Sequence, residues 1–115
     1  MAFGVMGGDM QPQGHVQVLL NLVDHGMSLQ EAGDAARFHH GGSSSPRGPV
    51  MTDGGTLNLE PEVPEAIRTE LAHRGHSIAD SPGVYGGYQA VARDPVTGCF
   101  QGATESRKDG CALGF

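Results

Sequence analysis

The chain has 115 residues and a mass of 11.9 kDa, which suits one small domain or a piece of a larger one. A net charge of −6 with only seven Lys and Arg argues against nucleic-acid or anionic-membrane binding, because both need a concentrated positive face. The apolar stretches are far shorter than the about 20 residues of a membrane helix, and the N-terminus lacks signal-peptide regions. We therefore expect no nucleic-acid or membrane partner, and the composition leaves the cellular compartment unknown.

The composition also limits the core. Leu, Ile, Val and Phe together make 23 of 115 residues, which predicts a thin apolar interior. Nineteen glycines without a collagen-like period indicate tight turns and close backbone contacts. Cys99 and Cys111 lack Cys-x-x-Cys spacing, so we expect free thiols.

The first part of the chain predicts a strand, a turn and a helix. The apolar run 2–6 is followed by Gly7-Gly8, which suits a strand that breaks into a glycine turn. From His15 to His25 the apolar residues recur at helical spacing, so we expect a helix that is buried on most sides and ends at Gly26. The apolar positions of this helix are Val16, Val18, Leu19, Leu20, Leu22 and Val23.

The middle of the chain predicts a second helix, a loop and a strand. Ser28 and Glu31 have the spacing of a capping box, which predicts a short helix to about Ala36. The polar stretch over 38–55 predicts a long surface loop. Alternation of apolar and polar residues over 56–60 predicts a half-buried strand.

The last part of the chain predicts a third helix and three strands. Pro64 opens the helix and Gly75 ends it, and a short strand over 77–79 follows. The runs on either side of the Pro/Gly turn at 94–98 predict an antiparallel hairpin over 88–103. The mixture of elements favours one domain over 1–115, of the α+β class or in a layered α/β arrangement.

Two adjacent glycines are the first candidate for chemistry. The N–H groups of Gly7 and Gly8 could approach one anionic oxygen closely, where side chains would obstruct it. From the residues alone, an ordinary structural turn is favoured over an anion or oxyanion site. The pair lacks the Gly-x-Gly-x-x-Gly spacing of a dinucleotide site.

Six histidines suggest a metal site, but their spacing does not. His39 and His40, near Asp34, are adjacent, and adjacent residues rarely offer two ligands to one ion. A small metal-binding module built on this pair is the weaker alternative, and we expect no metal and no cofactor. The other histidines are expected near helix ends, namely His15, His25, His73 and His76.

The charged run over 104–110 is expected to be a solvated turn with local ion pairs, in preference to a segment that positions a site. No serine stands in a Gly-x-Ser-x-Gly elbow, so the residues alone identify no nucleophile.

Four motifs in register carry a family resemblance: Met6–Gln17, Gly26–Ala32, Ala36–His40 and Gly102–Gly110. Together they resemble the C-terminal part of the small subunit in the gamma-glutamyltransferase family. The first motif is most similar to the branch with oxamate amidohydrolase-like and cephalosporin acylase-like members. The similarity extends over nearly the whole chain.

The resemblance implies a fold and an activity. The fold is the αββα sandwich of the N-terminal nucleophile hydrolases, made as a precursor that cuts itself into two subunits. The family's nucleophile is the terminal threonine of the small subunit, which forms an acyl-enzyme from a gamma-glutamyl or related small amide. The family's oxyanion-hole glycines match Gly7 and Gly8, so the resemblance makes these two the catalytic residues of the chain.

Departures from the family pattern limit this expectation. The chain begins shortly before the glycine pair, so the large subunit and the N-terminal part of the small subunit are expected as missing partners. We therefore expect the chain to be inactive alone. Milder departures are Ala36 in place of proline and Glu105-Ser106 in place of Asp-Pro. No threonine matches the nucleophile motif among Thr52, Thr56, Thr69, Thr97 and Thr104.

One alternative from another class is a stand-alone, non-catalytic protein. A thin core and strands that lack neighbours would leave exposed sheet edges, and these favour a homo-oligomer. The sequence does not determine the substrate or the acceptor.

Overall fold

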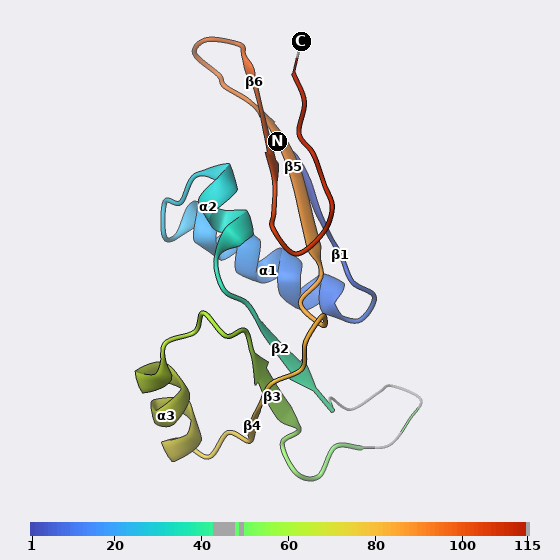
Figure 1. Cartoon of the computed structure of the whole chain (residues 1–115), viewed down its shortest axis with the longest axis vertical. Helices are drawn as coiled ribbons and strands as arrows, with labels where there is room; N and C mark the ends of the chain where they lie inside the picture. Colours follow the sequence, from blue (N-terminus) through green and yellow to red (C-terminus); the bar gives the residue numbers. More distant parts are fainter. Residues whose placement is uncertain (43–47, 49, 115) are drawn as a thin grey trace. The chain divides into compact units, whose positions relative to one another are not determined.

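The structure is a computed structural model that describes residues 1–42, 48 and 50–114. Helices are mixed with mainly antiparallel strands, which confirms the α+β class. The chain divides into two compact units, one formed by Met1–Ala35 with Gly86–Phe115 and the other by Ala36–Tyr85. Each unit has a three-stranded sheet of its own (Figure 1).

The first unit contains an antiparallel sheet in the order β1-β5-β6. Its strands are β1 (Ala2–Met6), β5 (Gly87–Arg93) and β6 (Phe100–Thr104), which confirms the predicted N-terminal strand and the predicted hairpin. In the hairpin turn, the Asp94 carboxylate accepts the N–H groups of Val96 and Thr97, both at 2.8 Å. These two hydrogen bonds lower the pKa of Asp94 below its ordinary value.

Two helices belong to the same unit: α1 (Met10–Val23) and α2 (Leu29–Asp34). α1 starts five residues before the predicted helix, and Gly26 after it has the expected left-handed φ of +64°. The capping box of α2 is confirmed, because the Glu31 N–H donates to Ser28 Oγ at 3.3 Å and the Ser28 N–H donates to the Glu31 carboxylate at 2.8 Å.

The core of the first unit lies between the helices and one face of the sheet. Glycines bring the elements together, since a Cβ on Gly14 would stand 2.7 Å from Cγ1 of Val5, and one on Gly33 would collide with the Tyr88 ring. Close contact at glycines therefore compensates for few large apolar side chains. The buried cluster consists of Val5, Val18, Ala32, Tyr88 and Ala103.

The prediction that the first helix is buried on most sides is wrong for this chain. Only one side of α1 faces the sheet, and its buried residues are Met10, Gly14 and Val18. One sheet and one short neighbouring helix cannot cover a helix all round. The side chains that stay 44–70% exposed are Val16, Leu19, Leu20 and Val23.

The second unit contains a mixed sheet in the order β2-β3-β4. β2 (Phe38–Gly41) is antiparallel to β3 (Thr56–Leu59), and β4 (Ile78–Ala79) is parallel to β3. α3 (Glu65–His73) connects β3 to β4, as expected from Pro64 and Gly75.

β2 corrects the prediction of one long loop over 38–55. Phe38 to Gly41 pair with Thr56 to Leu59, so a long-range strand contact overrides the polar local sequence. The part of the predicted loop at 43–47 and 49 lies outside the described residues. No helix in the described part of the chain is long and apolar enough to cross a membrane.

Candidate active-site turn

The predicted glycine pair lies in the turn between β1 and α1. A Cβ on Gly7 would stand 2.9 Å from the Cα of Gly86 and 3.3 Å from the Cβ of Met10, so a side chain there would displace the backbone. Gly8 has a φ of +56° and open space around its Cα. Gly7 therefore allows a close backbone contact, and Gly8 supplies a left-handed turn.

The carbonyl groups of the pair accept hydrogen bonds, whereas their N–H groups have no protein acceptor among the described residues. The Gly7 carbonyl accepts the Met10 N–H and the Gly8 carbonyl accepts the Gln11 N–H, both at 3.0 Å. Within residues 1–42, 48 and 50–114, neither Gly7 nor Gly8 donates its N–H to a protein acceptor. Both amides are thus available to a ligand.

The same hydrogen bonds set the direction of one amide. In a trans peptide, the carbonyl of one residue and the N–H of the next point in opposite directions. Because the Gly7 carbonyl points to the first turn of α1, the Gly8 N–H points away from that turn. The N-terminus of α1 adds partial positive charge beside the pair, which favours a negatively charged ligand.

His15 departs from its predicted place at a helix end, because it lies inside α1. Its two ring nitrogens contact residues on either side of the glycine turn, namely Val5 in β1 and Gln11 in α1. The sequence feature that could have indicated this contact is the spacing of Gln11 and His15. On a helix that begins at Met10, these two residues lie one turn apart on the same face.

The charged run after β6 has the local ion pair that was predicted, between Glu105 and Arg107, but it is not fully solvated. Glu105 is 3% exposed and its carboxylate accepts from Arg107 at 2.8 Å. Arg107 also donates to the carbonyls of Gly33 and Ala35 at the end of α2, both at 2.9 Å. The segment after β6 therefore ties itself to α2, and it is a structural anchor of the first unit.

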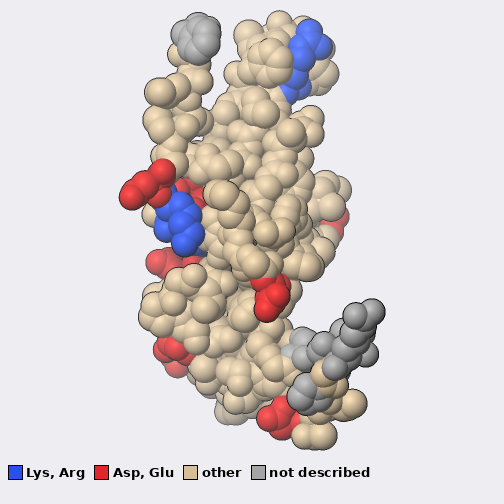
Figure 2. Space-filling model, turned by 90° about the vertical axis from the view of Figure 1, so that its right-hand side faces the viewer, with Lys and Arg blue, Asp and Glu red and all other residues tan. Residues whose placement is uncertain are grey.

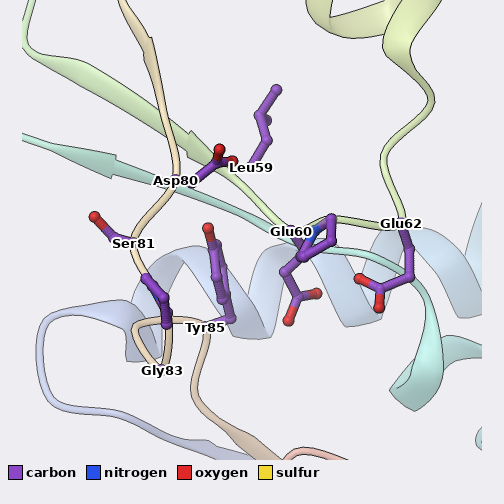
Figure 3. Close-up of a pocket in the computed structure, with 9 residues that line it drawn as sticks. Leu59, Glu60, Glu62, Asp80, Ser81, Gly83 and Tyr85 are labelled. Atoms are coloured by element: carbon purple, nitrogen blue, oxygen red, sulfur yellow. The ribbon is translucent and has the colours of Figure 1, made fainter.

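The second unit contains a cavity of about 230 Å³ beside Tyr85 (Figure 3). Burial raises the pKa of the Tyr85 phenol, with smaller contributions from Glu60 and Asp80. In Figure 3 the carboxylates of Glu60 and Asp80 point in different directions. Both have protein donors, the Arg37 N–H at 2.7 Å and the Arg68 guanidinium at 2.9 Å.

This cavity therefore offers a weaker case for chemistry than the glycine turn. The carboxylates of Glu60 and Asp80 serve the local structure, and these two do not form a converging pair of the kind that acid–base catalysis needs.

The histidine pair lies on β2, where successive side chains alternate between the faces of the sheet. His40 Nε2 is 2.8 Å from the Gly54 carbonyl, and the Asn58 amide donates to the His39 carbonyl at 3.1 Å. The described residues contain no group of three or more His, Cys, Asp or Glu side chains that could hold a metal ion. Cys99 and Cys111 are free, as predicted, and both are exposed.

Charge is dispersed on the face of the molecule that Figure 2 shows. On the face seen in Figure 2, Lys and Arg side chains lie apart from one another among spread Asp and Glu side chains. No concentrated positive patch stands on this face.

Comparison with known proteins assigns the chain to a protein family. The family model described as gamma-glutamyltranspeptidase matches residues 1–115. The chain belongs to the gamma-glutamyltranspeptidase family. Members of this family of N-terminal nucleophile hydrolases and acylases carry out amide hydrolysis and acyl transfer.

Individual relatives agree with this assignment. The chain is 43% identical over 95 residues to the acylase ACY 1 proenzyme of Pseudomonas sp. strain SE83, covering 83% of this chain and 15% of the relative. It is 32% identical over 121 aligned residues to the oxamate amidohydrolase proenzyme of Klebsiella pneumoniae, covering 100% of this chain and 21% of that protein.

A solved structure shows the same fold. The cephalosporin acylase from Bacillus halodurans superposes with a TM-score of 0.77 and 41% identity, covering 95% of this chain and 19% of that one. The chain spans between about one seventh and one fifth of the length of these curated relatives.

Proposed function

We propose that this chain supplies the oxyanion hole of a gamma-glutamyltranspeptidase-like amidohydrolase, through the N–H groups of Gly7 and Gly8. The reaction is acyl transfer from a gamma-glutamyl or related small amide. The nucleophile, its base and most of the substrate contacts come from polypeptide outside this chain. The single observation that carries the proposal is a glycine turn whose carbonyls accept hydrogen bonds while its N–H groups meet no acceptor in the described part of the chain.

Three features of the turn support this role. The contacts of Gly7 with Gly86 and Met10 leave no room for a side chain at this position. Because glycine has none, a substrate oxygen can approach the Gly7 N–H without steric obstruction. The Gly8 amide points away from α1 because the preceding carbonyl is bonded to that helix. The start of α1 adds a favourable potential for negative charge.

The expected energetic effect is large enough to matter. A donor aimed at the developing oxyanion contributes about 2.7–4 kcal/mol to transition-state stabilisation. Such donors act on an intermediate that a nucleophile must first create. We therefore expect the isolated 115-residue chain to hydrolyse neither oxamate, glutathione nor a gamma-glutamyl anilide, and turnover by the pure chain would disprove the proposal.

Alanine substitutions in the whole enzyme that carries this chain test the role of each glycine. Gly7→Ala would displace the backbone at Gly86, and Gly8→Ala would strain a left-handed residue by about 1–2 kcal/mol. Because a displacement of about 1 Å can reduce a rate about 100-fold, we expect kcat to fall by that order while KM changes little.

The chain offers a matched control for each substitution. Gly26, beyond the far end of α1, has a φ of +64° and nothing within 4 Å of an added Cβ. Gly26→Ala therefore introduces the same backbone strain as Gly8→Ala, but away from the proposed site. Gly4 lies in β1, three residues before Gly7, with nothing within 4 Å of an added Cβ. Gly4→Ala therefore adds the same methyl group near the turn without the steric clash of Gly7→Ala. An equal loss of kcat in the controls and the test variants would exclude a specific role for the turn.

A non-catalytic protein that self-associates is the second candidate. Within the described chain, β1 and β6 pair only with β5, so both lie at sheet edges. Edges of this kind favour pairing with a second copy. Size-exclusion chromatography with light scattering tests this candidate, since a monomer at all concentrations would count against it.

A further inference from the structure

The imidazole of His15 connects the two sides of the glycine turn. Its Nε2 lies 3.3 Å from the backbone nitrogen of Val5, and its Nδ1 lies 2.6 Å from the backbone oxygen of Gln11. Val5 is two residues before Gly7, and Gln11 is three residues after Gly8. One ring therefore spans the turn and adds side-chain contacts to the short-range backbone bonds at Gly7 and Gly8.

The two partners of the ring select one of its tautomers. A backbone N–H can only donate, so Nε2 must accept and carries no proton. A backbone carbonyl can only accept, so Nδ1 must carry the proton and donate to Gln11. These two contacts fit the tautomer of His15 with hydrogen on Nδ1.

Two features of the fold bring the ring to this place. β1 lies at a sheet edge of the described chain, so alternate N–H groups of the strand face away from β5, and that of Val5 faces His15. Gly14 lets α1 approach Val5 closely. The Phe3 ring lies beside the imidazole, with centroids 5.5 Å apart and planes at 47°, and limits its movement.

The restraint reaches the glycine pair through Gln11. The Gln11 carbonyl accepts from His15, and its N–H donates to the Gly8 carbonyl at 3.0 Å. The orientation of the first turn of α1, and with it that of the Gly8 peptide, thus depends on the imidazole.

We propose that His15 is a positioning residue, which connects β1 to α1 across the Gly7–Gly8 turn and holds the two amides in place. The connection itself is independent of the reaction. Its catalytic consequence rests on the proposed oxyanion-hole role of the turn.

The tautomer of His15 tests the connection without any activity assay. Long-range proton–nitrogen NMR on the 115-residue chain with labelled histidine should show His15 with hydrogen on Nδ1. His40 is an internal control with the opposite expectation, because its Nε2 must donate to the Gly54 carbonyl at 2.8 Å. Hydrogen on Nε2 of His15, or a mixture of tautomers, would overturn the connection.

Two substitutions in the whole enzyme test the catalytic consequence. His15→Leu keeps an apolar side chain but loses both hydrogen bonds, so we expect kcat with a gamma-glutamyl anilide, oxamate or glutathione to fall about 10- to 100-fold with little change in KM. His15→Gln offers a donor and an acceptor on one planar group, and it should recover most of the loss. If His15 had only a structural role, both variants would lower the free energy of unfolding, and kcat would not fall at a nearly constant KM.

The controls separate the two proposals. His25→Leu changes the same residue type at the other end of α1, where the side chain is exposed, and should leave kcat unchanged. If His15 has the expected tautomer but neither Gly8→Ala nor His15→Leu lowers kcat, the oxyanion-hole role fails and the connection stands. If Gly8→Ala lowers kcat and His15→Leu does not, the positioning role of His15 is wrong.

Discussion

The two units of the chain bury different kinds of side chain. The first unit surrounds Tyr88 with small apolar residues and glycines, and its one buried charged side chain among the described residues is Glu105. The second unit buries three polar side chains beside Leu59 and Tyr85, namely Arg37, Asn58 and Glu60. An apolar core tolerates loss of volume poorly, and a polar one tolerates loss of a hydrogen-bond partner poorly. The glycine turn belongs to the first unit, and a Cβ on Gly7 would stand 2.9 Å from the Cα of Gly86. Its geometry therefore depends on close backbone packing as well as on the hydrogen bonds of His15.

Removal of the central aromatic ring of the first unit should cause the largest loss in the free energy of unfolding. Tyr88 is fully buried against Gly33, so Tyr88→Ala should cost about 3–5 kcal/mol in the free energy of unfolding. Phe100, which is 74% exposed in the same sheet, is the control, and Phe100→Ala should cost about 0.5 kcal/mol or less. Urea unfolding measures both, and equal losses would contradict an apolar core around Tyr88.

Ion pairs sharpen the comparison between the units. The Glu105 side chain is 0% exposed and that of Arg107 is 16% exposed, so Arg107→Ala leaves a buried carboxylate without this pair. We expect a loss of about 3 kcal/mol, at the lower end for buried pairs. Arg74 and Glu70 in the second unit are 68% and 55% exposed, and Arg74→Ala should cost only about 0.3–0.5 kcal/mol. Similar losses in the two variants would contradict the anchoring role of Arg107.

The polar interior of the second unit predicts a different pattern. Glu60→Ala removes the carboxylate that accepts the Arg37 N–H, which should cost about 1–3 kcal/mol. Glu60→Gln keeps an acceptor oxygen and should cost less. Equal losses in both variants would mean that the charge matters more than this hydrogen bond.

The smallest expected effect concerns the capping box of α2. Ser28→Ala removes the acceptor of the Glu31 N–H and should cost about 1 kcal/mol. The backbone N–H and then the hydroxyl of Ser28 hold the pKa of Glu31 below its ordinary value of 4.5. Because the folded pKa is the lower one, this stabilisation is present above pH 4.5 and disappears as the pH falls through the folded pKa.

NMR titration of the Glu31 carboxyl checks the sign of this effect. The wild-type pKa should be lower than that of the Ser28→Ala variant, in which one of the two hydrogen bonds is absent. A higher pKa in the wild type would contradict the capping box.

Local signals in the sequence were enough for most of the fold. The capping box of Ser28, the stop at Gly26 and the hairpin around Asp94 all act within a few residues, and each was predicted. β2 was missed because its stability comes from pairing with β3, about 20 residues away. The exposed side of α1 was missed because helical spacing shows that a stripe is apolar and does not show what covers it.

The candidate site was predictable only in part. The residues alone favoured an ordinary turn at Gly7-Gly8, and it was the resemblance to a family that pointed to the oxyanion role. Neither source identified His15, since its partners are backbone atoms whose positions depend on how closely α1 approaches β1 at Gly14. The burial of Glu105 was also missed, because its partner Arg107 depends on carbonyls at the end of α2.

Replacement of one backbone amide by an ester tests the central claim most directly. In the whole enzyme, glycolic acid in place of Gly8 removes the N–H donor and adds no side chain, and the same change at Gly26 is the control. We predict that the ester at position 8 lowers kcat about 100- to 1,000-fold, while the ester at position 26 leaves kcat unchanged. Equal kcat values for the two esters would contradict the assignment of this turn as the oxyanion hole.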